Sequence, residues 1–401
     1  MRLVDDRERR ARFAVRHGLH PDHRVSGPVA AAESVVCLHA TEAATVHLAV
    51  GARTTGVTPF AVDEALYSDR SLVKQLAMRR TLFAFPRDLL PAALGVAVGR
   101  IAPEQRRLVS RDAARHGVAD DGQAWLDAAG AAVLAHLSGG GALSAKELRE
   151  ALPQLVGTIT VGEGKRYGGT FNLAPRVLGW LGAEGRITRG PNAGHWRSSR
   201  PAWTLMDTWL GAPVEPLPLD DAYAELVRRW LGRFGPGTLE DVQWWLGATK
   251  GATRTALAAI GAVEVALERD RTGWVLPDDV DPSPDVGPWA ALLPTLDPTA
   301  MGWKERGHHL DVDHRQWLYD TNGNAGTTAW WDGRAVGAWV QDEDGVVSVL
   351  ECPGTDIGRE GRAALALEAE RLTAWLDGVR ISTVYPSALT KRAARRADWA
   401  P

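Results

Sequence analysis

The chain has 401 residues, of which 45% are hydrophobic and 24% are charged, proportions that exclude a largely disordered protein. Its formal net charge of −3 excludes a polycation, so any contact with nucleic acid must come from local groups of basic residues. The two cysteines, Cys37 and Cys352, are too few for a disulfide-rich or zinc-finger protein and indicate reduced thiols in a cytosolic protein.

The first residues are rich in charged side chains, and no stretch approaches the roughly 18 uninterrupted apolar residues of a membrane-spanning helix. The sequence therefore predicts neither a signal peptide nor a membrane contact, and we expect a cytoplasmic protein. A chain of 401 residues is too long for one ordinary core and suits three or four modules of about 100 residues each.

The N-terminal segment predicts two helical regions. A basic helix lies within residues 1–30, a segment that ends at Gly27-Pro28. Residues 29–50 read as an apolar helix that polar residues interrupt near positions 38–41. The interruption places a short polar stretch inside an otherwise apolar segment.

The next segment is less regular. Its apolar pattern predicts helices over Val62–Leu66 and Ser71–Leu76, followed by a wing strand within MRRTLFAFP, residues 78–86. An unrelated α+β segment is the alternative interpretation. A hydrophilic helix, at residues 100–120, then leads to the middle of the chain.

One unit occurs twice in the middle of the chain: a helix, a turn broken by glycine, a second helix, and a pair of strands rich in Arg and Trp. The first copy spans residues 131–203 and the second spans residues 225–277. In the second copy Leu226, Trp230 and Phe234 recur at helical spacing. Each copy predicts a helix-turn-helix followed by a β-wing.

The chemistry of the turns supports this interpretation. In the first copy a glycine turn precedes Ser144, which can cap a helix together with Glu147 three residues later. In the second copy Gly235-Pro236-Gly237 precedes Thr238, with Asp241 at the same spacing. Both copies have a glycine-containing turn followed by a capping residue and an acidic residue three positions later. This shared pattern favours a repeated motif over coincidence.

Two proline-rich linkers, at 213–221 and 281–288, separate the last modules. Residues 327–351 alternate apolar and polar side chains, with Asp332-Gly333 and Asp344-Gly345 at turns, and so predict a β-meander. The C-terminal module therefore reads as a small α+β or barrel domain. A helix, a strand and a basic tail complete it, at residues 358–378, 379–385 and 391–396.

Together with the repeated wings, four segments carry a resemblance: LHAT at 38–41, MRRTLF at 78–83, LLPTLDPTAMGWK at 292–304 and NGNAGTTAWWDGRAVGAW at 322–339. Over essentially its full length the chain resembles the AlkZ/YcaQ-like winged-helix DNA glycosylases of bacteria. The resemblance implies an α+β fold, with three tandem winged-helix domains and a small C-terminal β-barrel-like domain bent around duplex DNA. The implied domains are residues 1–120, 121–212, 213–281 and 282–401.

The activity that the resemblance implies is that of a monofunctional DNA glycosylase. Such an enzyme hydrolyses the N-glycosidic bond of cationic N7-alkylated purines, including bulky natural-product adducts, in DNA repair or self-resistance. The implied partner is double-stranded DNA, bound by a monomer without a cofactor, a metal or a membrane. The alternative is a non-catalytic winged-helix DNA-binding protein or transcriptional regulator, which would normally dimerise to read a palindrome.

In the resembled family, catalysis uses a glutamine, an apolar residue, and a glutamine or aspartate. The matching positions here are His39, Ala40 and Thr41, so the resemblance assigns the catalytic roles to His39 and Thr41. A neutral imidazole can accept a hydrogen bond from water, and a threonine hydroxyl can orient the same water. The alternative is that both side chains end a helix and bond to each other or to nearby carbonyls. Glu42 is either the carboxylate that the motif lacks or an exposed helix carboxylate.

Basic residues of the predicted wings are the candidates for contact with DNA phosphates, although a solvated wing is the alternative. Arg79 and Arg80 are adjacent, so on a strand they would point to opposite faces and only one would reach the DNA. The Gly-rich loop at 162–169 lacks the pattern of a nucleotide-binding loop but offers two more cations. Trp196 lies among the arginines of the second wing, and an aromatic side chain between basic residues fits a wing that lies in a DNA groove. The expected DNA-binding residues are Lys74, Arg79, Arg80, Lys165, Arg166, Arg189, Arg197, Arg200 and Lys304.

The segment HHLDVDH, residues 308–314, contains three histidines and two aspartates, which are side chains that bind metals. Because the resembled family uses no metal, we interpret this segment as structural or as a solvated loop.

Overall fold

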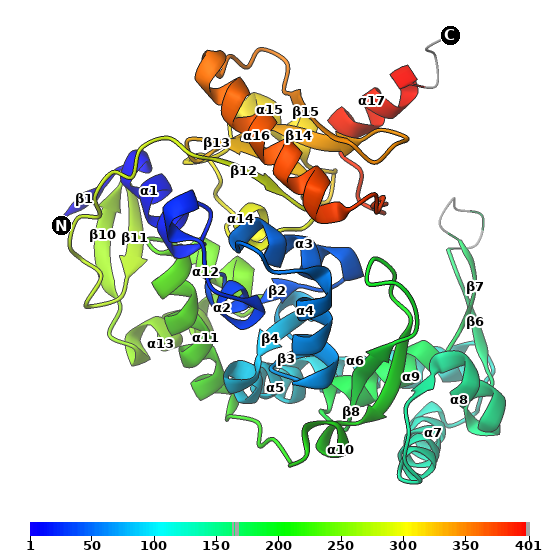
Figure 1. Cartoon of the computed structure of the whole chain (residues 1–401). Helices are drawn as coiled ribbons and strands as arrows, with labels where there is room; N and C mark the ends of the chain where they lie inside the picture. Colours follow the sequence, from blue (N-terminus) through cyan, green and yellow to red (C-terminus); the bar gives the residue numbers. More distant parts are fainter. Residues whose placement is uncertain (163, 165–167, 398–401) are drawn as a thin grey trace. The chain divides into compact units, whose positions relative to one another are not determined.

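The computed structural model describes residues 1–162, 164 and 168–397 (Figure 1). They form two compact units: the first contains residues 1–72, 84–86 and those from 223 onward, and the second contains residues 73–83 and 87–222. Helices and strands are mixed along the whole chain, which confirms the α+β class. The four domain boundaries predicted from the sequence remain a prediction.

The first unit begins with helices around a short strand. Every residue of the helix α3 is buried, and α2 begins at Pro28, where a proline loses no helical hydrogen bond. The predicted break near 38–41 is confirmed, because a two-residue strand separates α2 from α3. The elements are α1 (Asp6–Arg16), α2 (Pro28–Glu33), β2 (Leu38–His39), α3 (Ala43–Arg53) and α4 (Pro59–Asp63).

A second group of helices follows the predicted repeat. Thr238 and Asp241 form a complete capping box at the start of α12, as the sequence predicts. Trp230 is fully buried and stacks on Phe234 with ring centroids 5.6 Å apart. The elements are α11 (Leu219–Phe234), α12 (Leu239–Leu246), α13 (Lys250–Ala259), β10 (Val263–Leu267) and β11 (Arg271–Val275), with β1 (Leu3–Val4) paired to β10.

The C-terminal part contains a four-stranded sheet in the order β12-β13-β14-β15, all antiparallel (Figure 1). The predicted meander is confirmed, and the helix α16 packs on β12 and β15. Within the described residues the sheet has two open edges, so the predicted barrel-like closure is not confirmed. The elements are β12 (Ala290–Leu293), α14 (Pro298–Met301), α15 (Val312–Leu318), β13 (Thr328–Trp331), β14 (Arg334–Gln341), β15 (Val347–Glu351), α16 (Gly358–Leu376) and α17 (Ala388–Ala397).

The strand predicted at residues 379–385 is wrong, because this segment has no strand structure. Its backbone bonds instead to the side chain of Gln341: the amide nitrogen donates to the carbonyl of Val379, and the amide oxygen accepts from the N–H of Ile381. One half-buried amide thus satisfies backbone groups that a neighbouring strand would otherwise have paired.

Most of the remaining helices and strands lie in the second unit, although Leu72 and residues 84–86, at the ends of two strands, belong to the first. Ser144 and Glu147 form the predicted capping box at the start of α8. Three strands form a sheet in the order β5-β9-β8, and β6 pairs with β7. The elements are β3 (Leu72–Leu76), β4 (Leu82–Pro86), α5 (Leu90–Val96), α6 (Ala102–Arg115), α7 (Gly122–Leu137), β5 (Leu143–Ser144), α8 (Ala145–Ala151), β6 (Thr158–Val161), β7 (Gly169–Asn172), α9 (Ala174–Ala183), β8 (Ile187–Asn192), β9 (Pro201–Leu205) and α10 (Met206–Leu210).

The helix predicted over Ser71–Leu76 is also wrong, because these residues form β3. The chain turns back through Arg79 and Arg80, which have φ values of 52° and 58°, and the N–H of Thr81 donates to the carbonyl of Met78. Two consecutive positive φ values match a type I′ hairpin turn, which joins antiparallel strands. The local sequence lacks the usual Asn-Gly signal for this turn, so the apolar pattern alone was misleading.

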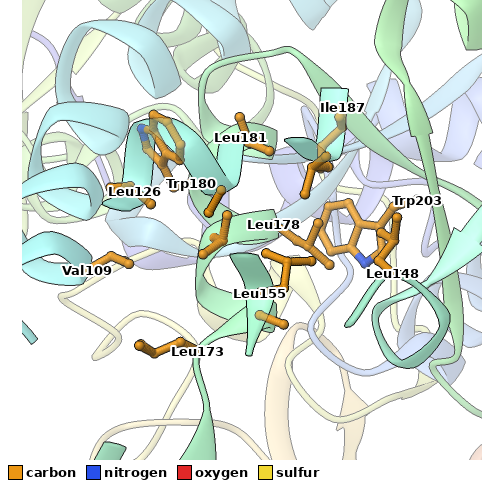
Figure 2. Packing of buried hydrophobic residues seen from close by; sticks show 14 of the residues in the cluster. Val109, Leu126, Leu148, Leu155, Leu173, Leu178, Trp180, Leu181, Ile187 and Trp203 are labelled. Atoms are coloured by element: carbon orange, nitrogen blue, oxygen red, sulfur yellow. The ribbon is translucent and has the colours of Figure 1, made fainter. Parts of the chain in front are cut away.

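The core of the second unit lies around α9 (Figure 2). Trp180 and Leu181 of this helix pack among Leu126, Leu148 and Trp203 from neighbouring elements. Gly130 of α7 permits the close approach of Trp180, since a Cβ at this position would lie 2.8 Å from the indole ring. This packing fixes β8 and β9, which carry Arg189 and flank the loop that contains Arg197 and Arg200.

Candidate active site and nucleic-acid interface

The predicted catalytic residues lie between β2 and α3. His39 is the second residue of β2 and is 6% exposed, whereas Thr41 is exposed in the connection that follows. The alternative that both residues end a helix is wrong, because the helix α2 ends before them, at Glu33. Thr41 immediately precedes the N-cap of α3, where the helix dipole presents partial positive charge.

Glu42 is the N-cap residue of α3, but its side chain does not cap that helix. One carboxylate oxygen accepts hydrogen bonds from the hydroxyl of Thr383, at 2.8 Å, and from the N–H of Val384, at 2.7 Å. Burial raises the pKa of Glu42, and the two hydrogen bonds oppose part of this rise. The interpretation of Glu42 as an exposed helix carboxylate is therefore wrong.

A cavity of about 380 Å³ opens beside Glu42. Polar lining groups come from α3 and the C-terminal segment, including Thr45, Thr383 and Lys391, while Trp339 supplies an aromatic wall. His39 and Thr41 are not among the described residues that line it. The cavity and the His39–Thr41 stretch therefore adjoin along the chain through Glu42.

Buried hydrogen bonds hold α3 in place. The hydroxyl of Thr45 donates to the carbonyl of Thr295 at 2.9 Å. At the other end, Arg53 donates to both carboxylate oxygens of Asp297 and to the hydroxyl of Thr299. The sequence analysis placed Asp297 in a family motif but did not identify Arg53 as its partner. The sequence signal for Arg53 was its position at the end of an apolar helix.

The basic residues predicted at the first wing lie at different positions. Lys74 belongs to β3, and Arg79 and Arg80 form the hairpin turn, so the expectation that these two arginines alternate on a strand is wrong. Arg80 is exposed and pairs with Glu104 at 3.1 Å. A turn places both side chains at one tip of the hairpin.

Three predicted DNA-binding arginines belong to β8 and the loop after it. Arg189 is half-buried on β8, whereas Arg197 and Arg200 are exposed in the loop before β9. Asn192 orders this loop by accepting from the N–H of Arg200 at 2.7 Å. Trp196 is only 9% exposed, which argues against a role in stacking on bases.

The remaining predicted residues divide into two groups. Lys304 is exposed in the first unit. Lys165 and Arg166 lie outside the described residues.

Two of the three histidines in segment 308–314 are part of the core. His308 and His309 are almost fully buried, with 2.9 Å between Nε2 of His308 and Nδ1 of His309, and both pack against Trp303. Burial lowers the pKa of both imidazoles well below the usual value, so they are neutral. Across the part of the chain that the structure describes, no group of three or more His, Cys, Asp or Glu side chains has the arrangement of a metal site.

Both cysteines are buried, and they form no disulfide. No described helix is long and apolar enough to cross a bilayer.

A nucleic-acid enzyme is the class that these features suggest, and comparison with known proteins identifies the family. Residues 32–375 match the family model described as DNA glycosylase AlkZ-like, so the chain belongs to the AlkZ-like DNA glycosylase family. Among solved structures it is similar to the Streptomyces sahachiroi DNA glycosylase AlkZ, with a TM-score of 0.73 and 24% sequence identity. This similarity covers 95% of the present chain and 99% of the other, and it shows a shared fold. No curated protein matches the sequence.

Proposed function

We propose that the protein is a monofunctional DNA glycosylase that removes cationic N7-alkylated purines, including bulky adducts, from double-stranded DNA. The observation that carries this proposal is the polar stretch His39–Glu42, which lies inside the segment matched by the family model and directly before the buried helix α3. A monomer suffices for this reaction, because one chain contains all the proposed groups.

The chemistry asks little of the protein at the leaving base. An alkyl group at N7 gives the purine a positive charge, so the base departs as a neutral molecule without a strong general acid. The remaining task is to place a water molecule and to stabilise an oxocarbenium-like sugar. In this proposal a neutral His39 accepts a hydrogen bond from the water, and the hydroxyl of Thr41 orients it.

The carboxylate of Glu42 suits the second part of the task. Its two hydrogen bonds fix the side chain. In this proposal the negative carboxylate stabilises the positive charge that develops on the sugar. The same bonds hold the C-terminal segment that lines the cavity beside it. Glu42 therefore supplies a negative group close to positions where related sequences use glutamine or aspartate.

For binding to DNA, we propose three winged-helix domains in tandem. In support, a helix, a helix pair and paired strands follow one another over residues 122–205 and again over residues 219–275. In this proposal the hairpin turn at Arg79-Arg80 is the tip of the first wing, and the exposed Arg197, Arg200 and Lys304 contact phosphates.

The experiment that tests the function uses a duplex carrying a single N7-methylguanine and, separately, one carrying a bulky N7 adduct. Excess protein is incubated with each duplex, and abasic sites are then cleaved with alkali. We expect strand breaks at the lesion only. Binding to the duplex without any strand break would instead support the second candidate, a non-catalytic DNA-binding protein, which the absence of glutamine at positions 39 and 41 favours.

A further inference from the structure

The positively charged guanidinium of Arg189 has no counter-ion among the described residues. It lies opposite Trp203 in the pairing of β8 with β9, and its guanidinium carbon is 4.8 Å from the centroid of the indole ring. No described residue makes an ion pair or a hydrogen bond with this side chain. Burial lowers the pKa of Arg189 to about 10, so the guanidinium is still charged at neutral pH.

The side chain lines a cavity of about 200 Å³ in the second unit. Two further basic residues, Lys74 and Arg176, line the same cavity, and none of the described lining residues is acidic. The charge of Arg176 is matched by Asp112, whose carboxylate lies 2.7 Å away. The wall therefore carries the positive charge of Arg189, which no described carboxylate matches.

The cavity also holds an unsatisfied polar group. Thr188 is 2% exposed and lines the cavity, and its hydroxyl has no hydrogen-bond partner among the described residues. The amide nitrogen of Gln75, another lining residue, is already used in bonds to the carbonyls of Leu76 and Gly182. Buried polar groups are nearly always paired, so an orphan beside an unmatched cation indicates a missing polar partner.

Packing on Trp203 does not account for a cation at this place. A guanidinium over an aromatic ring gains about 0.5–2 kcal/mol, whereas an apolar side chain would cover the ring without any loss of hydration. The planar guanidinium instead suits two nonbridging oxygens of one phosphate, which it can bond at the same time. The cavity is smaller than the roughly 300–1,000 Å³ that drug-sized ligands occupy, so a single group fits better than a whole nucleoside.

We propose that this cavity binds one phosphodiester group of the nucleic-acid backbone, with Arg189 bonding its nonbridging oxygens. The proposal rests on DNA binding as proposed above but not on catalysis. The site is specific for a phosphate at one register of the backbone and carries no information about base sequence.

The test compares Arg189→Met with a matched control, Arg115→Met. Methionine keeps an unbranched apolar stem over Trp203 and removes the charge, while Arg115 is an exposed cation of the same unit that does not line the cavity. Affinity for an undamaged duplex is measured at several chloride concentrations. For Arg189→Met we expect a loss on the order of tenfold or more and a salt slope shallower by about 0.9, the value for one phosphate. The control should keep the wild-type slope.

The thermal midpoint of Arg189→Met distinguishes a phosphate site from a purely structural side chain. If Arg189 has a structural role only, this midpoint will fall below that of the wild type, and the result overturns the proposal. We expect an unchanged or higher midpoint, because an unmatched charge has been removed.

Inorganic phosphate distinguishes the two sources of the ligand. A free phosphate ligand would raise the thermal midpoint of the wild type but not of Arg189→Met, while the salt slopes for DNA stay equal. Equal salt slopes for the wild type and Arg189→Met overturn the proposed backbone site, whether or not inorganic phosphate raises the thermal midpoint. A wild type that binds DNA with the expected slope but releases no base refutes the proposed catalysis and leaves this site supported, whereas a wild type that binds no DNA refutes both.

Discussion

Arg53 donates two hydrogen bonds to the carboxylate of Asp297, at 2.8 and 2.7 Å, and both side chains are fully buried. The pair joins the last residue of α3 to the N-cap of α14, although 244 positions separate the two residues in the chain. The hydroxyl of Thr299 accepts from Arg53 and lies 2.9 Å from Nδ1 of His17. The helix that follows the proposed catalytic residues is therefore anchored by charge in the core.

Removing one partner of this pair should be costly. We expect Asp297→Leu to lower the free energy of unfolding by about 3–5 kcal/mol, because the guanidinium of Arg53 is left buried and unmatched. Urea unfolding followed by tryptophan fluorescence measures the loss. The double variant Arg53→Met/Asp297→Leu is the control and should regain a large part of it. A single variant as stable as the wild type would show that water reaches this pair.

Glu42→Gln tests the environment of the carboxylate. Because the pKa of Glu42 in the folded protein is raised above its ordinary value near 4.5, ionisation of this group works against folding as pH rises through that window. Glutamine does not ionise but can still accept the two hydrogen bonds. As the pH rises from 4 to 7, the variant should therefore become increasingly stable relative to the wild type.

Thermal midpoints of the two proteins at both pH values measure this effect. Glu343→Gln, a change at an exposed carboxylate, is the control for the loss of one negative charge. A stability difference that does not change with pH would show that the pKa of Glu42 is not raised.

The turn at Arg79-Arg80 stores strain that a glycine would release. A left-handed conformation costs a non-glycine residue about 1–2 kcal/mol, and the exposed ion pair of Arg80 with Glu104 is worth about 0–1 kcal/mol. We expect Arg80→Gly to be more stable than Arg80→Ala by about 0.5–1 kcal/mol, because both variants lose the ion pair and the released strain exceeds the entropy cost of glycine. Arg80→Ala loses the ion pair but keeps the strain, so it should not stabilise. Equal unfolding midpoints in urea for the two variants would contradict this account.

Local chemistry made part of the fold predictable from the sequence. The capping boxes at Ser144 and Thr238 were read from residues three positions apart, and the structure has both. The meander was read from alternation and from Asp-Gly turns, and it is also present. Each of these signals depends on neighbours within a few residues, which is the range over which backbone geometry and side-chain chemistry act directly.

The remaining features depend on contacts between distant residues. The segment 379–385 looked like a strand, but its backbone bonds to Gln341, about 40 positions earlier in the chain. The carboxylate of Glu42 looked exposed, but it bonds to Thr383 across 341 positions. Arg189 was recognised as a basic wing residue, whereas the missing counter-ion and the enclosing cavity became visible only in the structure.

The proposed catalytic role of His39 gives the most direct prediction about activity. If the imidazole holds the attacking water, His39→Ala should slow base release by about 10²-fold or more and leave duplex affinity nearly unchanged, since a single positioned polar group is lost. His39→Gln should keep part of the activity, because its amide oxygen can accept from the same water. A protonated ring could not accept from the water, so the proposal requires the neutral imidazole. Single-turnover rates from pH 5 to pH 8 for the three proteins measure this, and a His39→Ala rate equal to that of the wild type at every pH would place catalysis elsewhere.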